Sequence, residues 1–286
     1  SLGGNIAERS GCIRAEASKL KGADIVLDMP SVGATENIML AAVGAQGTTN
    51  IHNAAREPEI TDLQEFLKQM GVRVQGAGSD LIQIEGSSNL LAPEHTIIPD
   101  RIEAGTHLIA AAICGGQVRV ENIIPEHLDS LLAKLKEIGA EIKAGSDYLQ
   151  ISTSQPLKAV DIKTLFYPGF PTDLQPQMMA LMTRLSGTSV ITEMVFENRF
   201  KHVSELRRMG ADILLEGQTA IVKGVKKLGG AVVEASDLRA GAALVLAALG
   251  AENTSIVDSI EHIDRGYENL EYKYRLLGAD IKRLPD

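Results

Sequence analysis

The sequence has no tryptophan, five tyrosines and five phenylalanines, so aromatic residues account for only 3% of its 286 positions. Hydrophobic residues nevertheless make up 44% of the chain. The cores must therefore be built from alanine, isoleucine, leucine and valine. This mixture is typical of a soluble globular protein, and the length is sufficient for two domains.

Cysteine is equally scarce, with Cys12 and Cys114 as the only two. Their spacing fits neither a disulfide framework nor a metal site, which favours a reducing cytoplasm. No apolar run reaches the length of a membrane span, and the run at 240–250 is interpreted as a buried helix. The first residues show no signal-peptide pattern.

Positive charge is also in short supply, since the formal net charge is -9. This balance argues against a general nucleic-acid surface, although a few local cations can still hold a small anion. The chain contains no Walker or dinucleotide fingerprint and no G-x-S-x-G elbow. Its six histidines have no spacing that suggests a metal site or a catalytic triad.

One pattern repeats along the chain with a period of about 70 residues. In each copy a segment rich in charged and apolar residues runs into a glycine, and alternating apolar and polar residues follow it. These glycines are Gly3, Gly71, Gly139, Gly210 and Gly278. A second landmark, a short strand-like segment, recurs with about the same period at 48–53, 117–122, 188–193 and 254–259. The chain is thus expected to begin partway through a copy and to continue an upstream segment.

Each copy predicts the same order of elements. The glycine suits the left-handed cap of an amphipathic helix, and two strands follow it. An extended connector then leads to a strongly apolar helix and to the strand of the second landmark. Apolar helices such as 240–250 must be buried, whereas the amphipathic ones should lie nearer solvent. We therefore expect an α/β fold with sheets outside and helices inside.

Polar residues precede each apolar helix, at 31–35, 100–104, 170–173 and 236–239. Helix capping by serine, threonine and aspartate is the simplest interpretation. It does not explain Arg101 and Arg239, because the helix dipole disfavours cations in the first turn. Equivalent helix starts in a repeat fold should face one surface, which predicts a site for phosphate-bearing ligands.

Arginine recurs beside an acid in three loops, at 54–59, 196–202 and 263–269. The neighbouring pairs are Arg56/Glu57, Glu197/Arg199 and Asp264/Arg265. Each pair alone could be a surface salt bridge of little energetic worth. Recurrence at equivalent strand ends favours a role in binding anions.

Seven segments in this order are recognisable: SVGAT, NAAREPEI, PDRIEAGT, FPTD, VFENRF, SDLRAGA and HIDRGYE. Together they resemble the UDP-N-acetylglucosamine 1-carboxyvinyltransferase family of enolpyruvyl transferases over essentially the whole chain. The resemblance implies an inside-out α/β barrel of repeated βαβαββ units in two domains. Residues 1–98 would be the later, incomplete part of the first domain. Residues 99–286 would be the second domain, lacking a strand supplied by an upstream N-terminus.

The resemblance also implies a reaction. The enolpyruvyl group of phosphoenolpyruvate would pass to the 3-hydroxyl of UDP-N-acetylglucosamine, with release of phosphate, in the first committed step of bacterial peptidoglycan synthesis. Cell shape and cell division would depend on that step. Asp173 would be the base at the sugar hydroxyl. Arg239 and Arg265 would clamp phosphoenolpyruvate, with Asp237 beside them.

Further binding residues follow from the same resemblance. The uridine-diphosphate loop would comprise Met29, Pro30, Ser31, Val32 and Gly33. Val195 and Phe196 would line the sugar site, and Arg101 would contact the ligand from the domain hinge. The family often has a basic residue at the position of Met29, so one phosphate contact is expected to be lost here. No metal or other cofactor is implied, nor any nucleic-acid or membrane partner.

Two alternatives remain open at this stage: a shikimate-type transferase and a non-catalytic UDP-sugar-binding paralogue. The family's mobile catalytic loop, with its acid, would lie upstream of Ser1. We therefore expect this chain alone to be inactive and the complete protein to be an active cytoplasmic monomer. Self-association of the isolated chain is a further possibility.

Overall fold

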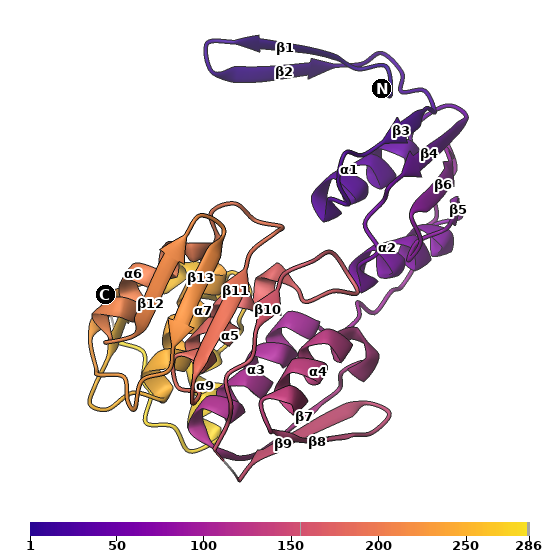
Figure 1. Ribbon diagram of the computed structural model, residues 1–286. Coiled ribbons are helices and arrows are strands. Elements are labelled where there is room, and N and C mark those ends of the chain that lie inside the picture. The colour runs from indigo at the N-terminus through magenta and orange to yellow at the C-terminus, as the bar shows by residue number, and fades with distance from the viewer. Residues whose placement is uncertain (155, 285–286) are drawn as a thin grey trace. The chain divides into compact units, whose positions relative to one another are not determined.

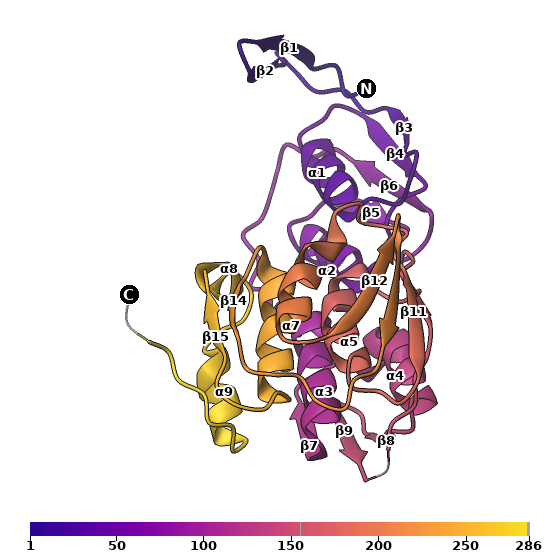
Figure 2. The same ribbon diagram turned by 60° about the vertical axis from the view of Figure 1, so that its left-hand side comes forward.

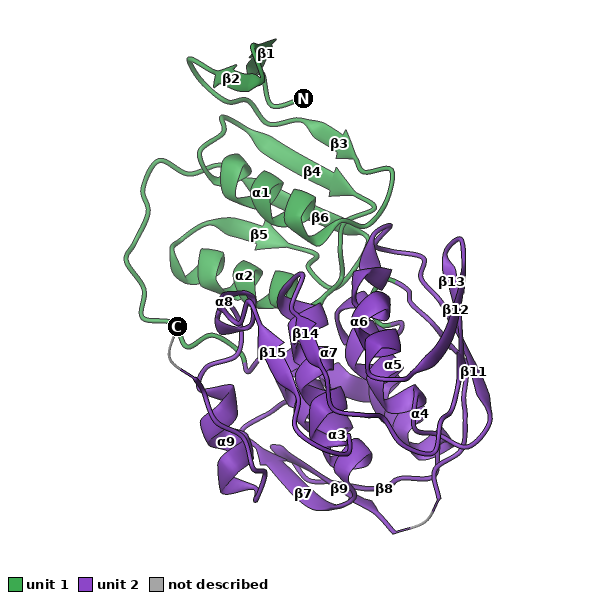
Figure 3. Ribbon diagram, turned by 90° about the vertical axis from the view of Figure 1, so that its left-hand side faces the viewer, with its two compact units in different colours: residues 1–98, 166–168 green, residues 99–165, 169–286 purple. Residues whose placement is uncertain are grey.

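The computed structural model describes residues 1–154 and 156–284, and the chain divides into two compact units. Unit 1 comprises residues 1–98 and 166–168, and unit 2 comprises residues 99–165 and 169–286 (Figure 3). Within the described residues, no helix has the length and apolar character needed to cross a membrane.

Unit 1 contains one complete copy of the repeat. Its elements are β3 (Asp24–Val26), α1 (Val32–Val43), β4 (Thr48–His52), α2 (Pro58–Gln69), β5 (Arg73–Gln75) and β6 (Leu81–Glu85). They form a sheet in the order β3-β4-β6-β5, in which β3 and β4 are parallel and the other pairs antiparallel. Met39, Ile51 and Ile82 are fully buried between helices and sheet. The preceding hairpin, β1 (Asn5–Arg9) and β2 (Cys12–Glu16), is exposed along its whole length.

Unit 2 contains three further copies, and its chain runs from purple through orange to yellow in Figure 1. The first consists of α3 (Arg101–Cys114), β7 (Gly116–Glu121), α4 (Asp129–Glu137), β8 (Glu141–Ala144) and β9 (Tyr148–Thr153). The second consists of β10 (Ile162–Lys163), α5 (Gln175–Met182), β11 (Thr188–Thr192), α6 (Val203–Arg208), β12 (Asp212–Glu216) and β13 (Thr219–Lys223). The third consists of β14 (Val232–Glu234), α7 (Leu238–Leu249), β15 (Ile256–Asp258), α8 (Glu261–Asp264) and α9 (Leu270–Leu276). Short 3-10 turns η1 (Pro125–Leu128), η2 (Thr172–Leu174) and η3 (Arg199–His202) precede α4, α5 and α6.

The apolar helices α3, α5 and α7 form the centre of unit 2, and the sheets lie around them (Figure 2). All eight residues of α5 are buried, and α7 is buried continuously from Ala240 to Ala247. The amphipathic α4 buries only Leu131, Leu132 and Leu135. The predicted α/β architecture with inner apolar and outer amphipathic helices is therefore confirmed.

The repeat glycines adopt the backbone conformation that the sequence predicts. Their φ angles are +89° at Gly3 and Gly71, +106° at Gly139, +93° at Gly210 and +96° at Gly278. A side chain is strained at such angles, whereas glycine accepts them. In the last four copies the glycine amide hydrogen-bonds the carbonyl oxygen of the residue three positions earlier. The order βαβαββ is complete at β3–β6 and at β10–β13.

Candidate active site

Three of the four polar helix starts are caps, as the simplest interpretation predicts. Ser31 caps α1, Asp100 caps α3, and Asp237 caps α7, each accepting from backbone amides of its first turn. The fourth start differs, because α5 has no side-chain cap hydrogen bond and Asp173 lies in the turn η2 just before it. The carboxylate of Asp173 is therefore available for another partner.

That partner is a pair of arginines. Asp173 Oδ1 lies 2.7 Å from Arg199 Nη2, and Asp173 Oδ2 lies 3.0 Å from Arg239 Nη2. The side chains of Arg199 and Arg239 are only 9% and 14% exposed, whereas that of Asp173 is 37% exposed. Two mostly buried guanidinium groups thus hold a more exposed carboxylate by charge-assisted hydrogen bonds.

Arg199 is held in place by more than its carboxylate partner. Its Nε donates to Thr172 Oγ1 over 3.0 Å, and its guanidinium carbon lies 4.4 Å from the centre of the Phe196 ring. The suggestion of a salt bridge between neighbours Glu197 and Arg199 is therefore wrong. Arg199 was singled out by its recurrence in the loops, but its contact with Asp173 joins positions 26 residues apart.

Arg239, in the first turn of α7, has a second polar contact. Its Nη1 donates to the hydroxyl oxygen of Tyr267 over 3.3 Å. Burial opposes its charge, but the nearby Asp173 carboxylate and Tyr267 hydroxyl raise the pKa of Arg239 above its ordinary value. The unfavourable helix dipole at this position is thus offset by a specific anion, and Arg239 remains a cation.

Asp237 and the buried His202 lie beside this arginine pair. Asp237 Oδ1 accepts from the amides of Arg239 and Ala240, each over 3.0 Å, and so fixes the start of α7. Burial lowers the pKa of His202 to about 4, against the opposing influences of Asp237 and the Arg199 carbonyl. His202 is therefore neutral near pH 7, and its Nδ1, 3.1 Å from the carbonyl oxygen of Arg199, donates to it.

Glu193 organises the segment that carries Val195 and Phe196, and the sequence interpretation overlooked it. It is 2% exposed, and its Oε1 accepts from Thr164 Oγ1 and from the amides of Val195 and Phe196 over 2.7, 3.0 and 2.9 Å. Val195 is half-buried and Phe196 is exposed. An acid at the end of the landmark segment 188–193, directly after β11, was the only sequence indication of this role.

Arg265 is not brought into the same cluster. It follows α8 with an exposed side chain, and within residues 1–154 and 156–284 no hydrogen bond or ion pair joins it to Asp173 or Arg239. Its neighbour Asp264 pairs instead with Arg283 over 2.6 and 2.9 Å. The interpretation of Asp264 and Arg265 as a salt bridge between neighbours is therefore also wrong.

The remaining predicted binding residues occupy other helix starts. In unit 1, Ser31 caps α1, Met29 is 54% exposed, and Gly33 is exposed in the first turn. Pro30 and Val32 are half-buried between them. In unit 2, Arg101 is the half-buried first residue of α3.

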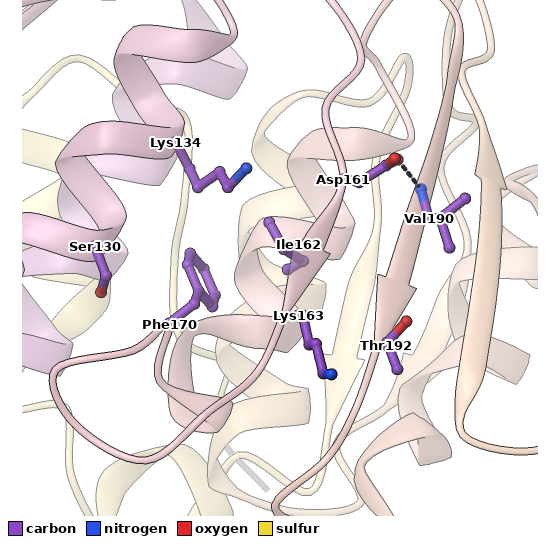
Figure 4. Close-up of a pocket in the computed structure, with 8 residues that line it drawn as sticks. All are labelled: Ser130, Lys134, Asp161, Ile162, Lys163, Phe170, Val190 and Thr192. Carbon is purple, nitrogen blue, oxygen red and sulfur yellow. Dashed lines mark hydrogen bonds between the residues drawn. The ribbon is translucent and has the colours of Figure 1, made fainter.

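A separate cavity of about 470 Å³ lies between α4 and the strands β10 and β11. In Figure 4 the ring of Phe170 and the side chain of Ile162 lie between Lys134 and Lys163. This cavity contains neither Asp173 nor the arginines that hold it. Among the described residues, no group of three or more histidine, cysteine, aspartate or glutamate side chains could hold a metal ion.

Comparisons with known proteins identify the family of the chain. The family model described as EPSP synthase (3-phosphoshikimate 1-carboxyvinyltransferase) matches residues 1–274. A UDP-N-acetylglucosamine 1-carboxyvinyltransferase of Carboxydothermus hydrogenoformans is 59% identical over 99% of this chain and 67% of its own length. One from Symbiobacterium thermophilum is 58% identical over 99% of this chain and 65% of its own length. The chain thus spans about two thirds of the length of these relatives.

Solved structures show the same fold. The enolpyruvyl transferase NikO from Streptomyces tendae has a TM-score of 0.90 at 26% identity, covering 98% of this chain and 70% of that protein. The EPSP synthase of Acinetobacter baumannii has a TM-score of 0.72 at 19% identity over 96% of this chain and 68% of that protein, which is evidence of fold alone. The chain therefore belongs to the EPSP synthase family of carboxyvinyl transferases and has their α/β fold.

Proposed function

We propose that this chain is part of a UDP-N-acetylglucosamine 1-carboxyvinyltransferase. The enzyme moves the enolpyruvyl group of phosphoenolpyruvate to the sugar 3-hydroxyl and releases phosphate. The observation that carries the proposal is the Asp173 carboxylate held between the mostly buried side chains of Arg199 and Arg239. The high identity to enzymes of that name supports it.

The roles of these residues follow from their chemistry. Phosphoenolpyruvate carries a phosphate and a carboxylate, and planar guanidinium groups bind both kinds of anion. We assign that task to Arg239, Arg265 and Arg199. Arg199 and Arg239 already hold one carboxylate, that of Asp173, which supports their assignment to the oxygens of an anionic ligand. Asp237 supports Arg239 by fixing the first turn of α7.

Asp173 is assigned as the base. It accepts the proton of the sugar 3-hydroxyl while that oxygen attacks the enol carbon of phosphoenolpyruvate and a general acid protonates the methylene carbon. Loss of a methyl proton then expels phosphate and restores the double bond. The exposure of Asp173, greater than that of its arginine partners, supports this role because its carboxylate can turn toward a ligand.

The nucleotide and sugar contacts are proposals of the same kind. We assign the uridine diphosphate to residues 29–33, which lead into α1, because the first turn of a helix favours a phosphate. Val195 and Phe196 are assigned to the sugar, and Arg101 to a further ligand contact. Residues 1–98 would belong to a first domain and residues 99–286 to a second.

The cellular setting follows from the proposed reaction. UDP-N-acetylglucosamine as acceptor places the enzyme in peptidoglycan synthesis, on which cell shape and division depend. The two cysteines are both free and exposed, which suits a reducing cytoplasm.

A shikimate-type transferase is the second candidate, because the matching family model bears that name. Calorimetric titration of the chain separates the two. UDP-N-acetylglucosamine should bind and shikimate 3-phosphate should not. The reverse result would replace the proposed acceptor, and binding of neither would contradict both assignments for this chain. For the complete protein, the matching activity assay is phosphate release from phosphoenolpyruvate with each acceptor.

A further inference from the structure

Behind Arg239 lies a buried tyrosine that no assigned role uses. Tyr267 is 1% exposed, and its hydroxyl meets side chains from the three central helices of unit 2. Its oxygen is 2.9 Å from Thr106 Oγ1 on α3, 3.2 Å from Gln177 Nε2 on α5 and 3.3 Å from Arg239 Nη1 on α7. Figure 2 shows these helices side by side.

The hydrogen positions in this cluster follow from counting donors and acceptors. Thr106 donates its single hydroxyl proton to the carbonyl oxygen of Ile102, 2.8 Å away. Tyr267 must therefore donate to Thr106, since one of the two has to supply a proton. The amide nitrogen of Gln177 donates to both hydroxyl oxygens, over 3.1 Å to Thr106 and over 3.2 Å to Tyr267.

This assignment leaves the tyrosine oxygen with one remaining lone pair. Arg239 Nη1 donates to it, so the hydroxyl donates once and accepts twice, which is its full capacity. The negative end of the hydroxyl dipole faces the guanidinium group. Because Nη1 is held by Tyr267, Nη2 of the same group is turned to Asp173.

We propose that Tyr267 is a positioning residue that orients Arg239 toward the anion site through this saturated hydroxyl. Tyr267 also follows Arg265 by two residues, so the same buried ring anchors the segment that carries the second proposed clamp. The binding consequence rests on the proposed function of Arg239, whereas the orientation of its guanidinium group does not.

A neighbouring residue provides a matched control. Tyr274 on α9 is 3% exposed, and its hydroxyl contacts His107 Nδ1 over 3.3 Å. Both tyrosines lose one buried hydroxyl on substitution by phenylalanine, but only Tyr267 touches Arg239. A purely structural role for Tyr267 predicts similar behaviour for the two variants.

The first test follows the Arg239 guanidinium group by nitrogen-15 NMR, with its signal assigned through Arg239→Lys. Tyr267→Phe should speed rotation about the Cζ–Nη1 bond by about tenfold or more, and Tyr274→Phe should leave it unchanged. Unchanged rotation in Tyr267→Phe would overturn the proposal. Should Tyr267→Phe fail to fold, Tyr267→Phe with Gln177→Leu removes the donor left unpaired and repeats the measurement.

The second test is a double-mutant cycle on binding of phosphoenolpyruvate to the chain. Tyr267→Phe should weaken binding by about tenfold, Tyr274→Phe should not, and Tyr267→Phe should have no further effect in Arg239→Ala. Additive effects would show that Tyr267 does not act through Arg239. Failure of the unmodified chain to bind phosphoenolpyruvate would contradict the proposed anion site in this chain, while the NMR result would still decide the orienting role.

Discussion

The carboxylate of Asp173 and the guanidinium group of Arg199 meet at 2.7 Å although 26 residues separate them in the chain. Asp173 precedes the buried helix α5, and Arg199 begins the turn before α6. With Arg239 on the other oxygen, the three residues form an anion site whose anion is, in this state, a side chain of the protein itself.

Replacing Asp173 tests its two proposed roles, as the anion held by Arg199 and Arg239 and as the base at the sugar hydroxyl. Asp173→Asn removes a negative charge that competes with ligand anions for two arginines, so inorganic phosphate should bind more tightly, by about tenfold. In the complete protein, turnover should fall by orders of magnitude, because the amide cannot accept the hydroxyl proton. Calorimetry measures the first effect and phosphate release the second. Near-normal turnover would reduce Asp173 to a structural residue.

Arg199→Lys keeps the charge but loses the planar group. A lysine cannot reach Thr172, Asp173 and the Phe196 ring together, so we expect the free energy of unfolding to fall by about 1–3 kcal/mol. Urea denaturation measures this loss. Arg208→Lys is the control, since Arg208 is 59% exposed, and neither its hydrogen bond to the carbonyl oxygen of Val232 over 3.1 Å nor its ion pair with Glu205 at 3.6 Å requires a planar group. Equal effects of the two substitutions would argue against the specific arginine geometry.

The buried His202 predicts a pH dependence of stability. Its pKa falls from 6.5 to about 4 on folding because burial disfavours the charged ring. Between pH 6.5 and 4 the unfolded chain therefore binds a proton at His202 and the folded chain does not. The free energy of unfolding decreases as the pH falls through this range. The full difference corresponds to about 3 kcal/mol.

The measurement is urea denaturation at several pH values between 7 and 4.5. The control is His202→Gln, which should be less stable at pH 7 but should lose the histidine part of the slope. Glu103 cannot account for the same window. A hydrogen bond from His107 and contact with Lys273, against opposing burial, lower its pKa to about 2, so its contribution is lost only below about pH 4.5. If stability depended on pH in His202→Gln as it does in the unmodified chain, His202 would not be the cause of that dependence.

Gly105 on α3 packs closely against Leu174, the residue that follows Asp173 of the candidate site. A Cβ atom at Gly105 would lie 2.7 Å from Leu174 Cδ1 and 3.0 Å from Leu131 Cδ2, and Leu174 directly follows Asp173. Gly105→Ala should therefore lower the free energy of unfolding by about 1–3 kcal/mol. Thermal unfolding measures this loss, and Gly33→Ala is the control, because no atom beyond its chain neighbours and its own helix backbone lies within 4 Å of its Cβ position. Loss of stability in the control alone would contradict this packing argument.

The periodicity of the repeat was sufficient to predict the helix ends and the buried helices. The spacing of Gly71, Gly139 and Gly210 predicted helix ends that the structure confirms, because a left-handed cap is a local requirement of the backbone. The burial of α5 and α7 was predictable for a similar reason, since helices apolar on nearly every face have no solvent side. The strand pairs within each copy followed from the same alternation of residues.

The candidate site was only partly visible in the sequence. Polar residues at four equivalent helix starts looked alike, yet Ser31, Asp100 and Asp237 are caps whereas Asp173 is not. Whether an aspartate caps its own helix or faces a distant arginine depends on what packs beside it. Glu193 was missed because its partners include Thr164, 29 residues away.

The sequence by itself determined the α/β repeat, its inner and outer helices and the resemblance to enolpyruvyl transferases, because these depend on local backbone needs and periodicity. Only the tertiary structure decided which polar residues act together. It joined Arg239 to Asp173 across 66 positions and placed the hydroxyl of Tyr267 behind that arginine. The physical reason is that buried charges and hydroxyls must find partners, and packing of α3, α5 and α7 decides which are within reach.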